Sequence, residues 1–165
     1  MGLTLRNIVL NLLYYGVVVA ILPYCLLSAE RSLGLSQPAF PILRIASIAV
    51  GLFGALLQLW SIVVFQRVGG GTPSPPLPPK QLVIRGPYWL VRNPMNVGEI
   101  MVLLALSGWF GSAALIGYAT AAALAFHIFI VRWEEPSHIA RFGDDYRRYK
   151  ARVNRWLPRL RALRG

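Results

Sequence analysis

Two groups of polar residues at the edges of apolar stretches could carry chemistry in this chain. The first, residues 85–98, reads RGPYWLVRNPMNVG and comes directly before an apolar stretch. The second, residues 133–136, reads WEEP and follows another apolar stretch further along the chain. Charged groups at the edge of a membrane-spanning segment are costly to place and are usually functional. We therefore expect the two groups to contribute to one site.

The first group contains the signature of a helix start. Proline suits the first helical turn, so Pro94 can begin a helix that Asn93 caps. A helix start presents free backbone N–H groups and the positive end of the helix dipole. The guanidinium of Arg92 adds a donor fork that suits a carboxylate. Anionic groups of a ligand would find partners here, although a capped helix with a snorkelling arginine explains the same residues.

The second group places two carboxylates side by side. If the helix continued, Glu134 and Glu135 would oppose its dipole. Pro136 could instead begin a new helix, with Glu135 as its cap. Adjacent carboxylates at a membrane edge cost energy unless they meet cations or hydrogen-bond donors. They are expected to bind cationic or hydroxyl groups of a ligand or, alternatively, to pair with Arg132 or the basic C-terminal residues.

The composition is that of a polytopic membrane protein. The 165 residues are 56% hydrophobic and only 14% charged, whereas a soluble domain carries about a quarter charged residues. The single cysteine, Cys25, excludes an intrachain disulfide and a cysteine metal cluster. The spacing of His127 and His138 matches no zinc site. We expect no bound metal.

The formal net charge of +11 is concentrated in two basic clusters that flank apolar stretches. Residues 132–165 hold ten basic and four acidic residues, and residues 66–92 hold four basic residues and no acidic one. Cytoplasmic loops of membrane proteins show this enrichment, and anionic membrane lipids are its natural partner. This distribution argues against a nucleic-acid partner.

The apolar stretches predict an all-α integral membrane protein with about four transmembrane helices. The stretches are residues 8–27, 41–65, 97–110 and 112–131. A secretory signal is the alternative interpretation of the first stretch. The third stretch is short for a span, and the uncharged residues 108–112 leave room only for a tight helical hairpin before the fourth.

Charge also predicts the topology. The first connection, which contains Glu30 and Arg31, is neutral, whereas both basic clusters are expected on the cytoplasmic side. The chain is therefore predicted to be multi-pass with both termini cytoplasmic. Residues 142–149, FGDDYRRY, predict the start of a basic amphipathic helix against the cytoplasmic membrane surface. The proline-rich residues 72–79 predict an extended segment, either a linker or a recognition motif.

Four short motifs follow one another along the same part of the chain. They are Gly-Pro-Tyr at 86–88, Arg-Asn-Pro-Met-Asn-Val-Gly at 92–98, Glu-Glu at 134–135 and Phe-Gly-Asp-Asp-Tyr-Arg-Arg-Tyr at 142–149, and VNRWLP follows at 153–158. In this order and spacing, residues 80–160 resemble bacterial isoprenylcysteine carboxyl methyltransferase-like proteins. The Asn-Pro-Met portion is also similar to phospholipid N-methyltransferases, which share the architecture. Asn96 stands where the family usually has tyrosine. The contacts that this family makes to its cofactor at that position are therefore expected to differ in this chain.

The resemblance implies an integral membrane methyltransferase that uses S-adenosylmethionine at the cytoplasmic membrane edge. Its motifs imply cofactor binding by Tyr88, Arg92, Asn93, Pro94, Asn96, Gly98, Glu99, Glu134 and Glu135. The candidates for a catalytic role are Arg92, Glu135 and Arg155. One domain overall is expected, with a two-span region at 1–68, a Gly/Pro-rich cytoplasmic loop at 69–84 and the cofactor-binding region at 85–165.

The residue chemistry agrees with this cofactor. Its ammonium and ribose hydroxyls suit Glu134 and Glu135, and its carboxylate suits Arg92 and helix-start N–H groups. The expected acceptor is lipophilic, either a carboxylate, a phospholipid amine or a thiol. Two other interpretations remain at this stage: a reductase related to sterol reductases, which would bind NADPH, and a non-catalytic membrane adaptor, which would bind neither cofactor.

Overall fold

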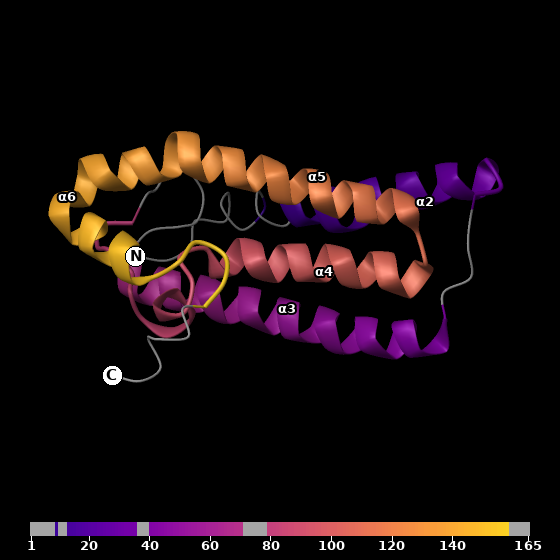
Figure 1. Cartoon of the computed structure of the whole chain (residues 1–165), viewed down its shortest axis with the longest axis horizontal. Helices are drawn as coiled ribbons and strands as arrows, with labels where there is room; N and C mark the ends of the chain where they lie inside the picture. Colours follow the sequence, from indigo (N-terminus) through magenta and orange to yellow (C-terminus); the bar gives the residue numbers. More distant parts are fainter. Residues whose placement is uncertain (1–8, 10–12, 36–39, 71–78, 159–165) are drawn as a thin grey trace. The chain divides into compact units, whose positions relative to one another are not determined.

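The computed structural model describes residues 9, 13–35, 40–70 and 79–158. Residues 71–78, half of the predicted Gly/Pro-rich loop, and both termini lie outside the described residues. The described residues form helices and no strand, which confirms the all-α fold class. Their order is η1 (Gly16–Ile21), α2 (Leu22–Ser32), α3 (Pro41–Gly69), η2 (Gly86–Trp89), α4 (Pro94–Phe110), α5 (Ala113–Phe129), η3 (Ile130–Glu134) and α6 (Glu135–Arg152). Figure 1 labels the α-helices.

Three of the described helical segments are long and apolar enough to cross a membrane. They are Leu13–Ser32, Pro41–Gly69 and Ala113–Arg152. The predicted third span corresponds to α4, an apolar helix of 17 residues, which is near the lower limit for crossing the hydrocarbon core. The structure therefore supports an integral membrane protein. Three of its described helical segments are long enough to span the membrane, whereas α4 is shorter.

The predicted tight hairpin between α4 and α5 is confirmed. Only Gly111 and Ser112 separate the two helices. Gly111 has φ 65°, a left-handed conformation that ends a helix at low cost only when the residue has no side chain. The Ser112 N–H donates to the Ser107 carbonyl at 3.0 Å. The helix continues through residues 108–110, so the connection is shorter than the sequence suggested.

The chain divides into two compact units, each built from two separate stretches. The first unit comprises Met1–Ala55 and Glu99–Ala123, and the second comprises Leu56–Gly98 and Leu124–Gly165. In the first unit, Gly51 allows close packing, because a side chain there would lie 3.1 Å from Ala105 Cβ.

Two carboxylates are buried in the first unit, and both accept hydrogen bonds from neutral donors. Glu30 lies in the last turn of α2 and not in a connection as the sequence suggested. It accepts hydrogen bonds from the Ser112 hydroxyl and from the Ala113 N–H, which lies at 3.2 Å. Glu99 accepts a hydrogen bond from the Tyr14 hydroxyl at 3.0 Å. These bonds tie α2 and the segment that contains Tyr14 to α4 and α5.

In the second unit, helical backbone runs from α5 through η3 into α6 without a break. Pro136 does not begin a separate helix, and Glu135, with φ −61° and ψ −44°, is inside the helical run. The suggestion that Glu135 caps a new helix is therefore wrong. A proline ring clashes with the carbonyl four residues before it in an α-helix. The wider π turn of η3 directly before Pro136 accommodates the ring.

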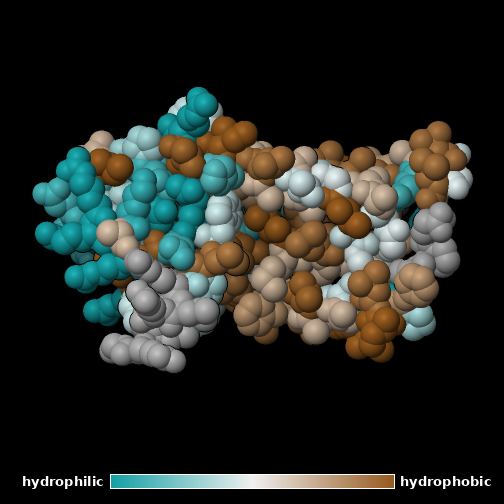
Figure 2. Space-filling model, in the orientation of Figure 1, coloured by the Kyte–Doolittle hydropathy of each residue, from teal (hydrophilic) through white to brown (hydrophobic). Residues whose placement is uncertain are grey.

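The second half of α6 is the predicted amphipathic helix. Gly143 has φ 54° and ψ −126°, which kinks α6 at the point where the sequence predicted a helix start (Figure 1). Beyond the kink, Tyr146, Tyr149 and Val153 are buried together. Hydrophilic side chains gather over α6 in the space-filling view, as Figure 2 shows. The kink thus lets one face of the helix cover the core of the second unit.

Candidate functional site

Glu135 is the centre of a buried charge cluster in the second unit. Its Oε1 atom accepts from Arg92 Nη1 at 2.8 Å and from Arg155 Nε and Nη2 at 2.8 and 2.7 Å. Its Oε2 atom accepts from Lys150 Nζ at 2.6 Å. The Glu135 side chain is only 4% exposed. A buried carboxylate is stable only when such partners compensate for its lost hydration, and here three cations do so.

The backbone of the C-terminal segment is attached next to this cluster. The Arg92 N–H donates to the Asn154 carbonyl at 2.9 Å. The Asn93 side-chain amide donates to the Arg155 carbonyl at 3.4 Å. The Trp156 indole donates to His127 Nδ1 at 3.1 Å. The first two contacts hold the residues that follow α6 against the start of α4, and the third holds them against α5. Glu135 and the C-terminal segment together fix the position of Arg92.

The short helix η2 positions Tyr88. Gly86 has φ 59°, and a side chain there would lie 3.1 Å from Val64 Cγ2, so only glycine allows this close approach to α3. The Tyr88 hydroxyl donates to the Ser61 carbonyl at 3.4 Å, and the Tyr88 carbonyl accepts from the Tyr149 hydroxyl at 2.5 Å. The Gly-Pro-Tyr motif thus joins α3 to α6.

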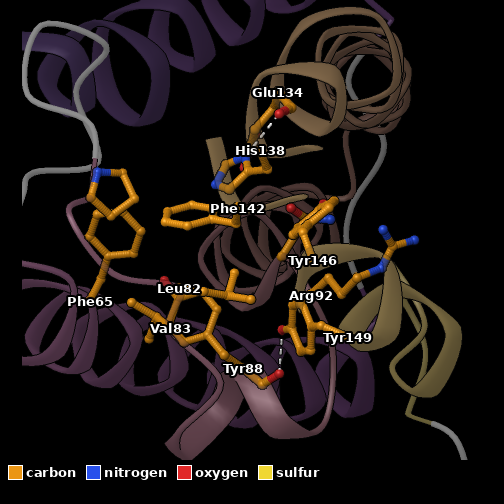
Figure 3. A pocket seen from close by; sticks show the side chains of 12 residues that line it. Phe65, Leu82, Val83, Tyr88, Arg92, Glu134, His138, Phe142, Tyr146 and Tyr149 are labelled. Atoms are coloured by element: carbon orange, nitrogen blue, oxygen red, sulfur yellow. Dashed lines mark hydrogen bonds between the residues drawn. The ribbon is translucent and has the colours of Figure 1, made fainter. Parts of the chain in front are cut away.

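A pocket of about 40 Å³ lies within the second unit. Aromatic and apolar side chains line most of it, together with one guanidinium, one carboxylate, one amide and one imidazole (Figure 3). The lining residues are Phe65, Pro79, Leu82, Val83, Tyr88, Arg92, Asn93, Glu134, His138, Phe142, Tyr146 and Tyr149. Its volume has room for only a few water molecules.

Two charged side chains at this pocket keep hydrogen-bonding capacity for a ligand. The backbone carbonyl of Glu134 accepts from His138 Nδ1 at 2.8 Å, but its carboxylate takes part in none of the ion pairs formed by the described residues. Among the described residues, Arg92 Nε is the buried side-chain nitrogen that has no hydrogen-bond partner. The Arg92 side chain is only 8% exposed. A buried donor without a partner costs free energy and is a candidate contact for a ligand.

The structure brings together some of the sequence-predicted site residues. Tyr88, Arg92, Asn93 and Glu134 line the pocket, and Glu135 and Arg155 meet in the adjacent charge cluster. Glu135 pairs with the C-terminal basic residues Lys150 and Arg155, as the alternative expectation for the carboxylate pair had it, and in addition with Arg92. The two glutamates therefore differ: Glu135 is fully bonded by the protein, whereas Glu134 faces the pocket.

Other predicted residues lie elsewhere in the second unit or in the first. Pro94 and Gly98 are buried and Asn96 is half-buried in the first turns of α4. None of these three lines the pocket. Glu99 belongs to the first unit, where its carboxylate accepts from Tyr14.

Sequence reasoning missed most of the aromatic lining. His138, Phe142, Tyr146 and Tyr149 line the pocket from α6, and His138 stacks on Tyr146 with ring centroids 5.2 Å apart. The signal was present in the Phe-Gly-x-x-Tyr-x-x-Tyr motif, which we interpreted as the start of an amphipathic helix and as part of the family resemblance, but not as a wall of a pocket. Residues three and four apart share a helix face, so the spacing of Phe142, Tyr146 and Tyr149 could have predicted an aromatic wall.

Comparison with known proteins identifies the family. Residues 42–145 match the phospholipid methyltransferase family, and the chain therefore belongs to it. This confirms the resemblance read from the motifs and indicates a membrane methyltransferase that acts on lipid. An uncharacterized protein of Haemophilus influenzae is similar to this chain, with 35% identity over 63 residues, which are 38% of this chain and the whole of that protein. No solved structure matches the chain.

In the described part of the chain, no three His, Cys, Asp or Glu side chains lie close enough together to hold a metal ion.

Proposed function

We propose that the chain is an S-adenosylmethionine-dependent methyltransferase that transfers a methyl group to a lipophilic acceptor at the cytoplasmic membrane edge. The observation that carries this proposal is the aromatic pocket with one carboxylate and one guanidinium, Glu134 and Arg92, at its wall. The family favours a phospholipid amine among the acceptors considered from the sequence.

The donor set of the pocket fits the chemistry of this cofactor. An ammonium group and ribose hydroxyls match the Glu134 carboxylate, and an amino-acid carboxylate matches the free Nε–H of Arg92. A purine ring and a positively charged sulfonium both match aromatic faces such as those of Phe142 and Tyr146. The cavity of about 40 Å³ is smaller than the cofactor, so binding requires the rings to move apart. Gly143 lies between Phe142 and Tyr146 in the sequence, so a change of its backbone angles can move the two rings relative to each other.

Glu135 acts in this proposal as a positioning residue. Its carboxylate accepts hydrogen bonds from Arg92, Lys150 and Arg155 and is 4% exposed, so it has little capacity left for a ligand. Glu135 accepts a hydrogen bond from Arg92 Nη1, and the Nε–H of the same guanidinium remains available to a ligand. Glu134 is the residue of the pair that binds the cofactor.

The cofactor supplies an electrophilic methyl group, so the protein does not need a nucleophile of its own. Arg92 and Glu134 orient opposite charges of the ligand from two walls of the pocket. The aromatic residues exclude water, which strengthens those interactions. Correct positioning of two reactants supplies a large part of such a rate enhancement.

Calorimetry of the detergent-purified protein tests this proposal. We expect S-adenosylhomocysteine to bind the unmodified protein and NADPH not to bind. Glu134→Gln should weaken binding about tenfold or more, because a hydrogen bond to a charged group contributes about 1.5–3 kcal/mol. Asp144→Asn is the matched control, since Asp144 is an exposed acid of α6 paired only with Arg147.

The outcomes discriminate between the interpretations left open by the sequence. Binding of NADPH alone would support the reductase, and binding of neither ligand would support the adaptor. Unchanged affinity in Glu134→Gln would show that this carboxylate does not contact the cofactor.

A further inference from the structure

A second, larger cavity lies in the second unit and shares two lining residues, Leu82 and Tyr149, with the aromatic pocket. Its volume is about 500 Å³, which lies within the range of small-molecule binding sites. It is lined by Leu82, Ile84, Trp89, Asp145, Arg148, Tyr149, Arg152 and Val153. We refer to it as the α6 groove.

One wall of the α6 groove is apolar. It is formed by Leu82, Ile84 and Trp89, and the exposed fractions of Ile84 and Trp89 are 38% and 45%. Tyr149 and Val153 also line the groove, and both are only 5% exposed. A partly exposed tryptophan beside an aliphatic wall is typical of the membrane interface.

The part of the lining that α6 contributes carries positive charge. Arg148 and Arg152 are four residues apart on α6 and therefore project from the same helix face. Arg148 Nη2 pairs with Asp145 Oδ1 at 2.5 Å, but both side chains are strongly exposed, 68% and 71%, so this pair contributes little and can exchange partners. Arg152 takes part in none of the ion pairs formed by the described residues. Two guanidinium groups against one carboxylate leave the groove with a net positive charge.

The apolar wall and the α6 part of the lining together define the chemistry of the ligand. Guanidinium groups bind phosphate oxygens through paired hydrogen bonds, and the apolar wall favours an attached hydrocarbon portion. The groove residues of α6 follow the apolar helix α5, which is long and apolar enough to be part of a membrane span, in one helical run through η3, and this favours a membrane lipid as the ligand. An amphiphile with a phosphate headgroup and net negative charge matches all of these features.

We propose that the α6 groove binds the headgroup of an anionic membrane phospholipid that is distinct from the methyl acceptor. The phosphate contacts Arg148 and Arg152, and the glycerol and first acyl carbons lie against Ile84 and Trp89. Because Leu82 and Tyr149 line both spaces, a bound lipid also supports one wall of the aromatic pocket. The inference depends on the groove alone and stands whether or not the pocket holds S-adenosylmethionine.

Lipid binding can be measured on the whole protein in a neutral detergent. Phosphatidylglycerol or phosphatidylcholine with identical acyl chains is titrated while intrinsic tryptophan fluorescence is recorded. We expect the unmodified protein to bind phosphatidylglycerol at least about tenfold more tightly than phosphatidylcholine, the ratio that 1.4 kcal/mol of charge-assisted bonding provides. The preference should decrease with added salt, because the two arginines are exposed.

Matched arginine variants locate the site. Arg148→Gln with Arg152→Gln should abolish the preference for phosphatidylglycerol. Arg147→Gln is the control, because Arg147 is an equally exposed arginine of α6, 64% exposed and paired with Asp144, but does not line the groove. If the double variant does not fold, Arg152→Gln alone should reduce the preference at least about threefold, as loss of a single exposed ionic contact would.

Three results would overturn the proposal. Equal affinity of the unmodified protein for both lipids would show that the groove does not select a negatively charged headgroup. An equal loss in Arg147→Gln and in the double variant would indicate nonspecific attraction to α6. Saturable binding of phosphatidylcholine alone would assign the groove to a zwitterionic lipid, such as the methylated product of an amine phospholipid.

Discussion

The two compact units differ in how they compensate buried carboxylates. In the first unit, Glu30 and Glu99 are 7% and 3% exposed and accept hydrogen bonds from hydroxyl groups and a backbone N–H. In the second unit, Glu135 is 3% exposed and is surrounded by three cations. Glu134, next to it, faces a pocket without an ion pair to any described residue.

Under the proposed function, this difference separates acidic residues that stabilise the fold from acidic residues that serve the site. The neutral donors of the first unit connect helix ends and helix faces, as when Glu30 binds the start of α5. In the second unit, the cations that meet Glu135 also fix a guanidinium at the wall of a pocket. Charged groups are retained in apolar surroundings mainly where they serve function. In the second unit, Glu135 and its three cations form such a group.

Removing the charge of Glu135 should have the largest effect. Glu135→Gln leaves three cations around a neutral side chain, and breaking a buried ion pair from one side costs about 3–5 kcal/mol. We expect a large decrease in the free energy of unfolding in detergent, measured by denaturant titration. Asp145→Asn breaks an exposed pair and should change stability by less than about 1 kcal/mol. Similar losses in the two variants would contradict the assigned role of the cluster.

The matching change in the first unit should be smaller. Glu30→Gln retains an acceptor for the Ala113 N–H but weakens the bond from the Ser112 hydroxyl, so we expect a loss of about 1 kcal/mol in unfolding free energy. Cofactor affinity should stay unchanged. If Glu30→Gln lowered the free energy of unfolding as much as Glu135→Gln does, the neutral donors around Glu30 and the cations around Glu135 would not differ in their contribution to stability.

The smallest expected effect concerns Asn96, the departure from the family motif. Asn96→Tyr should retain or tighten S-adenosylmethionine binding by no more than about 1–1.5 kcal/mol, the net contribution of one hydrogen bond. Asn96 is half-buried and does not line the pocket, which agrees with a modest effect. Complete loss of binding, measured by calorimetry, would show that the surroundings require asparagine.

Much of the architecture could be predicted from the sequence because apolar length and breaker residues are local signals. The apolar stretches gave the helices, and Gly111 between two of them gave the tight hairpin. Gly143 marked the beginning of the amphipathic part of α6. The continuation of helix through Pro136 could not be predicted, because it depends on a π turn that no residue pattern reveals.

The site could be predicted only in part because its contacts are distant in sequence. Adjacent helical residues point in directions about 100° apart, so Glu134 and Glu135 had to face different surroundings. Which of them meets the cations depends on Arg155, which lies 20 positions away. Similarly, the partner of Glu99 is Tyr14, which lies 85 positions away, so a motif that suggested cofactor binding there could not reveal the contact.

The most direct test of the account measures cofactor affinity and unfolding free energy for Glu134→Gln and Glu135→Gln in the same detergent preparation. We predict that the loss of affinity and the loss of stability occur in different variants. Glu134→Gln should lose affinity for S-adenosylhomocysteine with little change in stability, because its carboxylate faces the pocket. Glu135→Gln should lose stability, because its carboxylate compensates three cations. Equal losses of affinity and stability in both variants would contradict the division between a binding and a positioning glutamate.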